Sequence, residues 1–103
     1  MGGRVADRIP LKGKVTFSCE NKIYPGTVTN LSEKGMFIRV KKTCCNLGQT
    51  FEVSFPLEHD KINITVKPVR IVTIAKCFEG VGVEIIDPPE VYLDFVYDLI
   101  AVL

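Results

Sequence analysis

The sequence KVTFSCEN, residues 14–21, alternates polar and apolar side chains and then ends in a polar pair. Val15, Phe17 and Cys19 fall on one side of an extended chain, and the polar residues between them fall on the other. The pair Glu20-Asn21 then supplies a tight polar turn. This stretch predicts a half-buried strand entering an antiparallel hairpin, with Cys19 as a small apolar strand residue.

The alternation continues through most of the chain, with turn residues roughly every eight to twelve positions. The return strand is expected over residues 22–29, and further strands follow it. Six short strands with one apolar side predict a mainly β fold in which residues 12–86 close into an antiparallel β-barrel without exposed edges. The inward positions of the third to sixth strands are Met36, Ile38, Val40, Phe51, Val53, Phe55, Leu57, Ile62, Ile64, Val66, Val81, Val83 and Ile85.

The fifth run, residues 62–74, is interrupted by Pro68, and the alternation changes phase beyond it. Because proline has no N–H to donate to a strand ladder, a bend or bulge is expected there. In the sixth run, Gly80 and Gly82 lie on the side opposite the apolar residues. Glycines in such positions let another backbone or a ligand approach closely.

A C-terminal helix is predicted over residues 88–102. Asp87 is expected as its N-cap, Pro88 as its first residue, and Glu90 as the residue that completes a capping box. This helix either closes one side of the barrel core or also offers apolar surface to a partner protein or a second subunit, so a homodimer through it stays open. Its wide apolar stripe comprises Tyr92, Phe95, Val96, Leu99, Ile100 and Leu103.

The composition is that of a folded domain. Of 103 residues, 47% are hydrophobic and 24% charged, so one globular domain over residues 1–103 is expected. No apolar run reaches the roughly 18 residues that a membrane span needs, and none follows Arg4 as in a signal peptide. We therefore expect a cytoplasmic protein that does not insert into a membrane.

The cysteines and the single histidine do not suggest a catalytic or metal site. The four cysteines lack paired CxxC spacing, so no metal and no cofactor are expected. His59 lies in a polar turn without an evident nucleophile beside it, so an enzyme is the least favoured class. The role of the adjacent Cys44 and Cys45 stays open.

Charge is divided unevenly along the chain. Residues 1–50 hold nine Lys or Arg against three Asp or Glu, whereas residues 51–103 hold four against nine. The first half is therefore the half that attracts anions. It contains two motifs, RxxxR at Arg4 and Arg8, and NxSxxG in NLSEKG, residues 30–35.

Each motif has residue types suited to an anionic ligand that carries guanine. Two guanidiniums four residues apart are poor core material, but their rigid forks fit both phosphate and the N7 and O6 acceptors of guanine. Asn30 offers an amide that donates and accepts, Ser32 a rotatable hydroxyl, and Gly35 freedom from a side chain where the chain turns. Either motif alone is ordinary, and the hexapeptide alone is common turn chemistry.

Together, in this order and with a hairpin between them, the motifs resemble those of the PilZ domain, the bacterial receptor domain for cyclic di-GMP. GMFI at residues 35–38, LGQ at 47–49 and GVGVEI at 80–85 are also similar to segments of that family. The resemblance covers nearly the whole chain. It implies a six-stranded barrel with a C-terminal helix, in agreement with the strand pattern.

The resemblance also implies roles for the motif residues in binding cyclic di-GMP. Arg4 and Arg8 would grip phosphate and guanine, Asn30 and Ser32 would hydrogen-bond a guanine, and Gly35 would permit the close approach. A segment such as residues 1–10, ordered only when ligand is bound, would change the surface presented to a protein target. In that family the residue before the first arginine influences how many nucleotides bind. Gly3 occupies that position here and has no side chain, so the number of nucleotides per subunit, one or two, stays open.

Two other functions remain alternatives to nucleotide reception. One is a PilZ-like module that has lost nucleotide binding and acts through protein contacts alone. The other is a small barrel that binds single-stranded nucleic acid, which needs aromatic residues among the basic ones on an exposed face. Because Phe17, Phe51 and Phe55 alternate inward, we expect no nucleic-acid polymer as partner. The downstream target and output are not encoded in any recognisable pattern.

Overall fold

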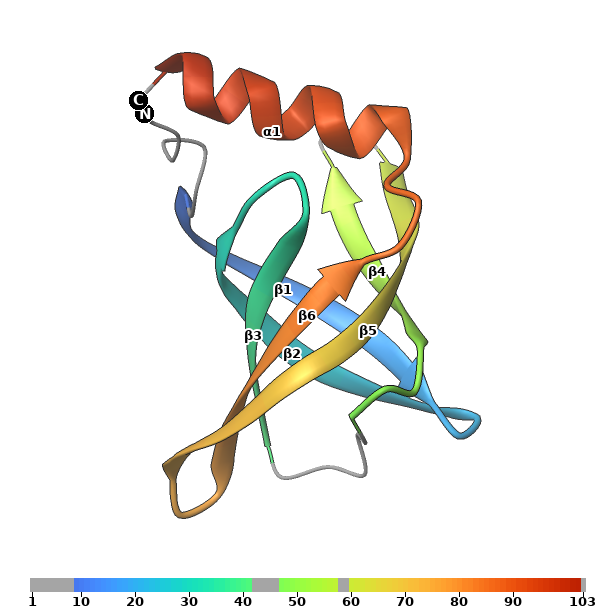
Figure 1. Cartoon of the computed structure of the whole chain (residues 1–103), viewed down its shortest axis with the longest axis vertical. Helices are drawn as coiled ribbons and strands as arrows, with labels where there is room; N and C mark the ends of the chain where they lie inside the picture. The colour runs from blue at the N-terminus through green and yellow to red at the C-terminus, as the bar shows by residue number, and fades with distance from the viewer. Residues whose placement is uncertain (1–8, 42–46, 58–59, 103) are drawn as a thin grey trace.

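The computed structural model describes residues 9–41, 47–57 and 60–102. They form six strands followed by one helix (Figure 1). The elements are β1 (Ile9–Cys19), β2 (Lys22–Leu31), β3 (Gly35–Lys41), β4 (Phe51–Leu57), β5 (Asp60–Ala75), β6 (Phe78–Ile85) and α1 (Glu90–Val102).

The strands close into a barrel in the order β1-β2-β3-β6-β5-β4, and every neighbouring pair is antiparallel. The seam between β1 and β4 is short and runs from Thr16↔Ser54 to Ser18↔Glu52. Closure pairs the edge strands with each other and leaves no open sheet edge there. The predicted fold class, a six-stranded antiparallel barrel with a C-terminal helix, is confirmed.

The core lies inside the barrel and is built from the inward positions of the alternating strands. In β1, Val15, Phe17 and Cys19 are buried while the residues between them are exposed. The same alternation places Met36, Ile38 and the other predicted inward residues in one continuous apolar cluster. Exceptions are Phe51 and Ile62, which are half-buried at its margin, and Leu57, whose side chain lies outside the described set.

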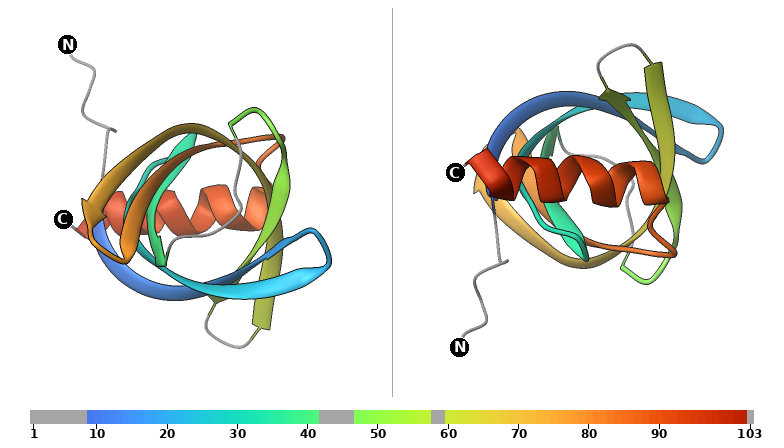
Figure 2. Two further views of the ribbon diagram at one scale, coloured as in Figure 1. Left: turned by 90° about the horizontal axis from the view of Figure 1, so that it is seen from below. Right: turned by 90° about the horizontal axis from the view of Figure 1, so that it is seen from above.

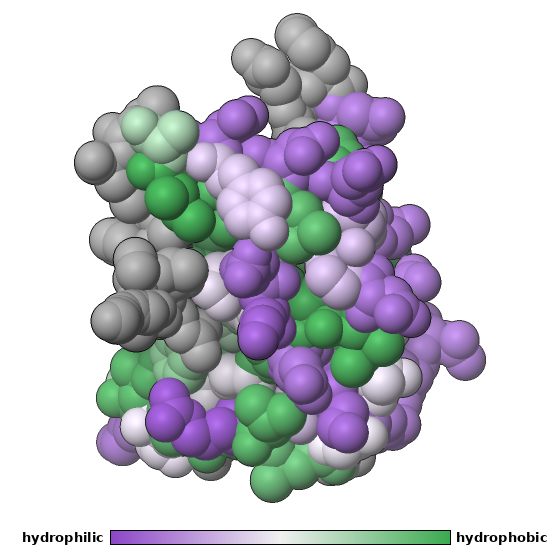
Figure 3. Space-filling view, turned by 45° about the horizontal axis from the view of Figure 1, so that its top comes forward, coloured by the Kyte–Doolittle hydropathy of each residue, from purple (hydrophilic) through white to green (hydrophobic). Residues whose placement is uncertain are grey.

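Helix α1 lies across one end of the barrel (Figures 1 and 2). Tyr92 and Val96 are 0% exposed and belong to the core. The ring of Phe55 meets Tyr92 edge to face at 5.9 Å and Phe95 at 5.4 Å between centroids. The predicted closing role of the helix is therefore confirmed. Its other side leaves Tyr97 half exposed, and apolar and polar residues are intermixed at this end of the molecule (Figure 3).

The helix begins later than predicted. The carbonyl of Pro89 accepts hydrogen bonds from the backbone N–H groups of Tyr92 at 3.0 Å and Leu93 at 3.1 Å, so Pro89 is the N-cap. Asp87 instead has φ 47°, in the left-handed region, and belongs to the turn that leads out of β6. The assignment of Asp87 as N-cap and Pro88 as first helical residue is wrong, because an N-cap has an extended backbone and accepts the first helical bond.

The ladders contain four register shifts, of which two bear on the candidate site. In β5 the register shifts between Pro68 and Arg70, which confirms the predicted bulge near Pro68. In β2 it shifts between Val28 and Asn30, where no irregularity was predicted. Each bulge adds one residue to a strand and so reverses which side the following residues face.

Among the described residues, no helix is long and apolar enough to cross a membrane. Of the described cysteines, Cys19 is buried and Cys77 is exposed. Cys77 lies in the turn between β5 and β6. Cys44 and Cys45 lie outside the described residues.

Candidate nucleotide site

Residues 30–35, which we call the motif turn, connect β2 to β3. The backbone N–H of Ser32 donates to the carbonyl of Gly35 at 2.8 Å, and its hydroxyl lies 3.4 Å from the same oxygen. The backbone N–H of Lys34 donates to the Ser32 hydroxyl at 3.3 Å. The serine therefore closes the turn from inside while remaining half-buried, with an edge open to a ligand.

Gly35 is glycine because of a neighbouring strand. A Cβ at this position would lie 2.6 Å from the carbonyl oxygen of Val83 in β6, closer than real Cβ contacts allow. Its φ does not lie in the left-handed region, which among the described glycines only Gly48 adopts. The physical requirement is thus close approach of the β6 backbone, rather than the freedom to turn that the sequence suggested. The N–H of Ile85 adds a 2.8 Å hydrogen bond to the Lys34 carbonyl.

The bulge in β2 sets the direction of Asn30. Val28 and Leu31 are both fully buried although they are three positions apart, so Thr29 is the extra residue. Asn30 is thereby paired with Phe37, whose neighbours along β3 are buried, and it lies on the outer face of the barrel. Sequence periodicity alone would have directed Asn30 inward with Val28. The three-residue spacing of Val28 and Leu31 was the signal for this bulge.

Two tyrosines of α1 are hydrogen-bonded to the motif turn. The hydroxyl of Tyr92 donates to the Ser32 carbonyl at 2.7 Å, and the hydroxyl of Tyr97 donates to Glu33 Oε2, also at 2.7 Å. The hydrogen bond to Glu33, together with its negative charge, raises the pKa of Tyr97 above its ordinary value of 10.0. Sequence reasoning placed these tyrosines on the helix but gave no sign of their partners.

The predicted arginines Arg4 and Arg8 lie outside the described residues. The structure does describe the chain that follows them directly. Ile9 pairs with Leu31 and Pro10 with Asn30, in the antiparallel ladder of β1 and β2. The backbone therefore enters the barrel beside the motif turn, and Asn30, Ser32 and Gly35 lie together at that point.

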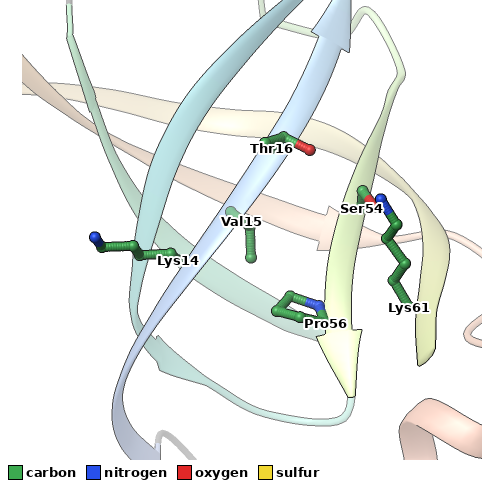
Figure 4. Close-up of a pocket in the computed structure, with 6 residues that line it drawn as sticks. All are labelled: Lys14, Val15, Thr16, Ser54, Pro56 and Lys61. Carbon is green, nitrogen blue, oxygen red and sulfur yellow. The ribbon is translucent and has the colours of Figure 1, made fainter. Parts of the chain in front are cut away.

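Two hollows elsewhere on the barrel are not lined by the motif turn. One, of about 190 Å³, lies at the seam of β1 and β4, between Lys14, Pro56 and Lys61 (Figure 4). The other, of about 350 Å³, is lined by Lys14, Arg39, Lys41 and Phe78 among others. The first falls below the roughly 300–1,000 Å³ of usual small-molecule pockets. No cluster that could hold a metal ion occurs among the residues that the structure describes.

Comparison with known proteins gives one family and one informative structure. The family model described as the PilZ domain matches residues 3–100. A solved structure, the Borreliella burgdorferi PlzA protein in complex with c-di-GMP, superposes with a TM-score of 0.72 at 15% sequence identity. The alignment covers 95% of this chain and 41% of PlzA, and at that identity it shows a shared fold alone.

No curated protein sequence matches the chain significantly. The family match nonetheless spans nearly the whole chain, from before the first arginine into the helix that closes the barrel. It therefore includes both motifs and the strands β1 and β2 that connect them in sequence. The chain belongs to the PilZ domain family.

Proposed function

We propose that this protein is a cytoplasmic, non-catalytic receptor for cyclic di-GMP. The observation that carries the proposal is the register of β1 on β2, which pairs Pro10 with Asn30. Because Arg8 lies two residues before Pro10, the RxxxR motif leads directly into the strand beside the motif turn. Membership of the PilZ family and the fold shared with a c-di-GMP complex support the same ligand.

The two motifs contribute different kinds of contact to the ligand. Arg4 and Arg8 bring positive charge and rigid donor forks to the phosphates and to a guanine edge. Asn30 and Ser32 add neutral donors and acceptors on a turn that is already closed by its own hydrogen bonds. The proposed site thus combines the hydrogen-bonded motif turn with the segment that carries Arg4 and Arg8.

We infer that ligand binding orders residues 1–10 against the barrel and that the altered surface is read by a protein target. The hydrogen bonds from Tyr92 and Tyr97 to the motif turn give α1 a direct connection to the site. Hydrogen exchange tests this switch: residues 5–12 are expected to gain protection at saturating cyclic di-GMP. Unchanged protection with normal binding would overturn the switch and leave the receptor intact.

Calorimetric titration with cyclic di-GMP tests the receptor function itself. Wild type should bind, and the heat should give one or two nucleotides per subunit. Arg8→Ala should lose most of the affinity, whereas Lys14→Ala, which removes the same charge from an exposed position on β1, should not. Absence of heat from wild type would instead favour a PilZ-like protein-interaction module without nucleotide.

The nucleic-acid alternative has one observation in its favour, the groove lined by Lys14, Arg39, Lys41 and Phe78. The Phe78 ring is half-buried, however, and already lies 5.5 Å from the guanidinium of Arg39, so it is not an open stacking platform. Binding of single-stranded DNA that falls steeply with salt and ignores added cyclic dinucleotide would establish this alternative. A homodimer through α1 is tested by sedimentation with and without ligand.

A further inference from the structure

The bulge at Val69 in β5 acts on Arg70 as the bulge at Thr29 in β2 acts on Asn30. Pro68 is buried and pairs with Val83, whereas Arg70 pairs with Gly82 and is exposed. In a regular strand, residues 68 and 70 would face the same way. The extra residue, Val69, turns Arg70 to the outer face of the barrel. Bulges sacrifice ladder hydrogen bonds and are over-represented beside functional sites, where they redirect a side chain.

The two redirected side chains lie at opposite ends of one register row. Asn30 pairs with Phe37, Phe37 with Gly82, and Gly82 with Arg70, across β2, β3, β6 and β5. Neighbouring strands are about 4.8 Å apart, so the row spans on the order of 14 Å between backbones. The outer face of this row therefore begins at the motif turn and ends at an arginine that neither motif contains.

Between Asn30 and Arg70 lies the ring of Phe37, which packs over Gly80 of β6. A Cβ at Gly80 would fall 2.2 Å from Cζ of Phe37, so the ring lies directly over the β6 backbone. Gly82, the next outward residue of β6, also lacks a side chain, so none projects from the strand there. The outward glycines predicted to allow a close approach thus accommodate the ring of Phe37.

The guanidinium of Arg70 lies over this ring, with Cζ 5.9 Å from the Phe37 centroid. The negative face of the ring attracts the Arg70 guanidinium and keeps it close to Phe37 in β3. No acidic side chain forms an ion pair with Arg70 among residues 9–41, 47–57 and 60–102. Its donor fork is therefore positioned by Phe37 and left available to a ligand.

We propose that Arg70, positioned by Phe37, is a third arginine of the nucleotide site and contacts a guanine base of cyclic di-GMP. This inference rests on the proposed receptor function. A guanidinium offers a flat face for stacking on a purine and two parallel donors for guanine O6 and N7, whereas adenine presents an amino donor at the first of these positions.

Calorimetry on four proteins tests the contact. Arg70→Ala is expected to weaken cyclic di-GMP binding by about 10-fold or more, the range for loss of one bidentate base contact. Lys61→Ala removes the same charge from an exposed position near the start of β5 and is expected to bind like wild type. Arg70→Lys keeps the charge without the fork and is expected to recover only a minor part of the loss.

Three results separate the possible failures. If wild type does not bind, the proposed function fails and the inference fails with it. If wild type binds and Arg70→Ala matches Lys61→Ala, the receptor stands and the third arginine is refuted. If Arg70→Lys restores full affinity, a point charge is sufficient and the guanine contact is wrong. Unchanged thermal unfolding of each variant controls for folding.

Base selectivity gives a readout that a structural role would not move. The affinity ratio of cyclic di-GMP to cyclic di-AMP is expected to fall by several-fold in Arg70→Ala, since one guanine-reading fork is removed. Phe37→Leu keeps an apolar side chain over Gly80 but removes the ring face that holds the guanidinium, and a smaller fall is expected. An unchanged ratio in both variants would contradict the proposal.

Discussion

Two hairpin turns follow one another in this chain, and they are built differently. The first, Glu20-Asn21 between β1 and β2, has φ values of 52° and 66°, the backbone of a tight turn that matches strand twist. It is made by local geometry. The motif turn between β2 and β3 has hydrogen bonds of its own and is in addition held by distant elements, Tyr92 and Tyr97 of α1 and strand β6. A turn tied to distant elements has a fixed shape, which a binding site requires and a simple connection does not.

The largest effect is expected from Gly35→Ala in the motif turn. The added Cβ would meet the Val83 carbonyl oxygen at 2.6 Å, and because that oxygen is backbone, β3 or β6 must shift. We expect a loss of about 1–3 kcal/mol in the free energy of unfolding, measured by urea denaturation. Gly13→Ala is the matched control, because a Cβ there has nothing within 4 Å. Equal effects of both substitutions would show that the motif turn has no special constraint.

A smaller effect is expected from Tyr92→Phe. The ring is fully buried and is retained, but the 2.7 Å hydrogen bond to the Ser32 carbonyl is lost. Leaving that carbonyl without its donor should cost about 1–2 kcal/mol in urea denaturation. The comparison is sharpened by Asn21→Gly in the first turn, expected within about 0.5 kcal/mol of wild type, since glycine adopts its positive φ readily. A larger effect at Asn21 than at Tyr92 would reverse the comparison.

The sequence was sufficient for features that repeat locally. Period-two alternation predicted the strands and most of the core because every second residue of a strand faces inward and is apolar. Pro68 predicted its bulge because proline has no N–H to donate to the ladder. It was insufficient where geometry depends on partners far along the chain. The contact of Tyr92 with Ser32 joins residues 60 positions apart, and the clash that demands glycine at position 35 comes from β6.

The N-cap was misassigned for a related reason. Asp87 and Pro88 have the composition of a helix start, but the chain must first turn out of β6 to cross the barrel end. That turn uses the left-handed φ of Asp87 and delays the helix to Glu90. Asn30 and Ser32 were predicted by motif and their site roles stay predictions. The row that continues from Asn30 to Arg70 follows from two bulges, and only the second was expected from sequence.

The smallest effect on stability is expected at Tyr97, whose exposed hydroxyl connects α1 to the motif turn by a hydrogen bond to Glu33. Its neutral hydroxyl donates to Glu33, so the folded state holds the proton to a higher pH than the unfolded chain and the pKa is raised above 10.0. The stabilisation from this hydrogen bond is therefore complete below the unfolded pKa and is lost as pH rises through the folded one. Tyrosinate absorbance during alkaline titration measures it, and the difference from Tyr97→Phe isolates one of three tyrosines.

Glu33→Gln provides the charge control for this titration. Glutamine can still accept the hydrogen bond but carries no negative charge, so the pKa of Tyr97 should move back toward 10.0 without a change in the fold. A midpoint in Glu33→Gln identical to that of wild type would mean that Tyr97 does not contact the motif turn in solution. The turn would then be tied to the helix by Tyr92 alone, and α1 would be connected to the nucleotide site through a backbone carbonyl rather than through a side chain that changes with pH.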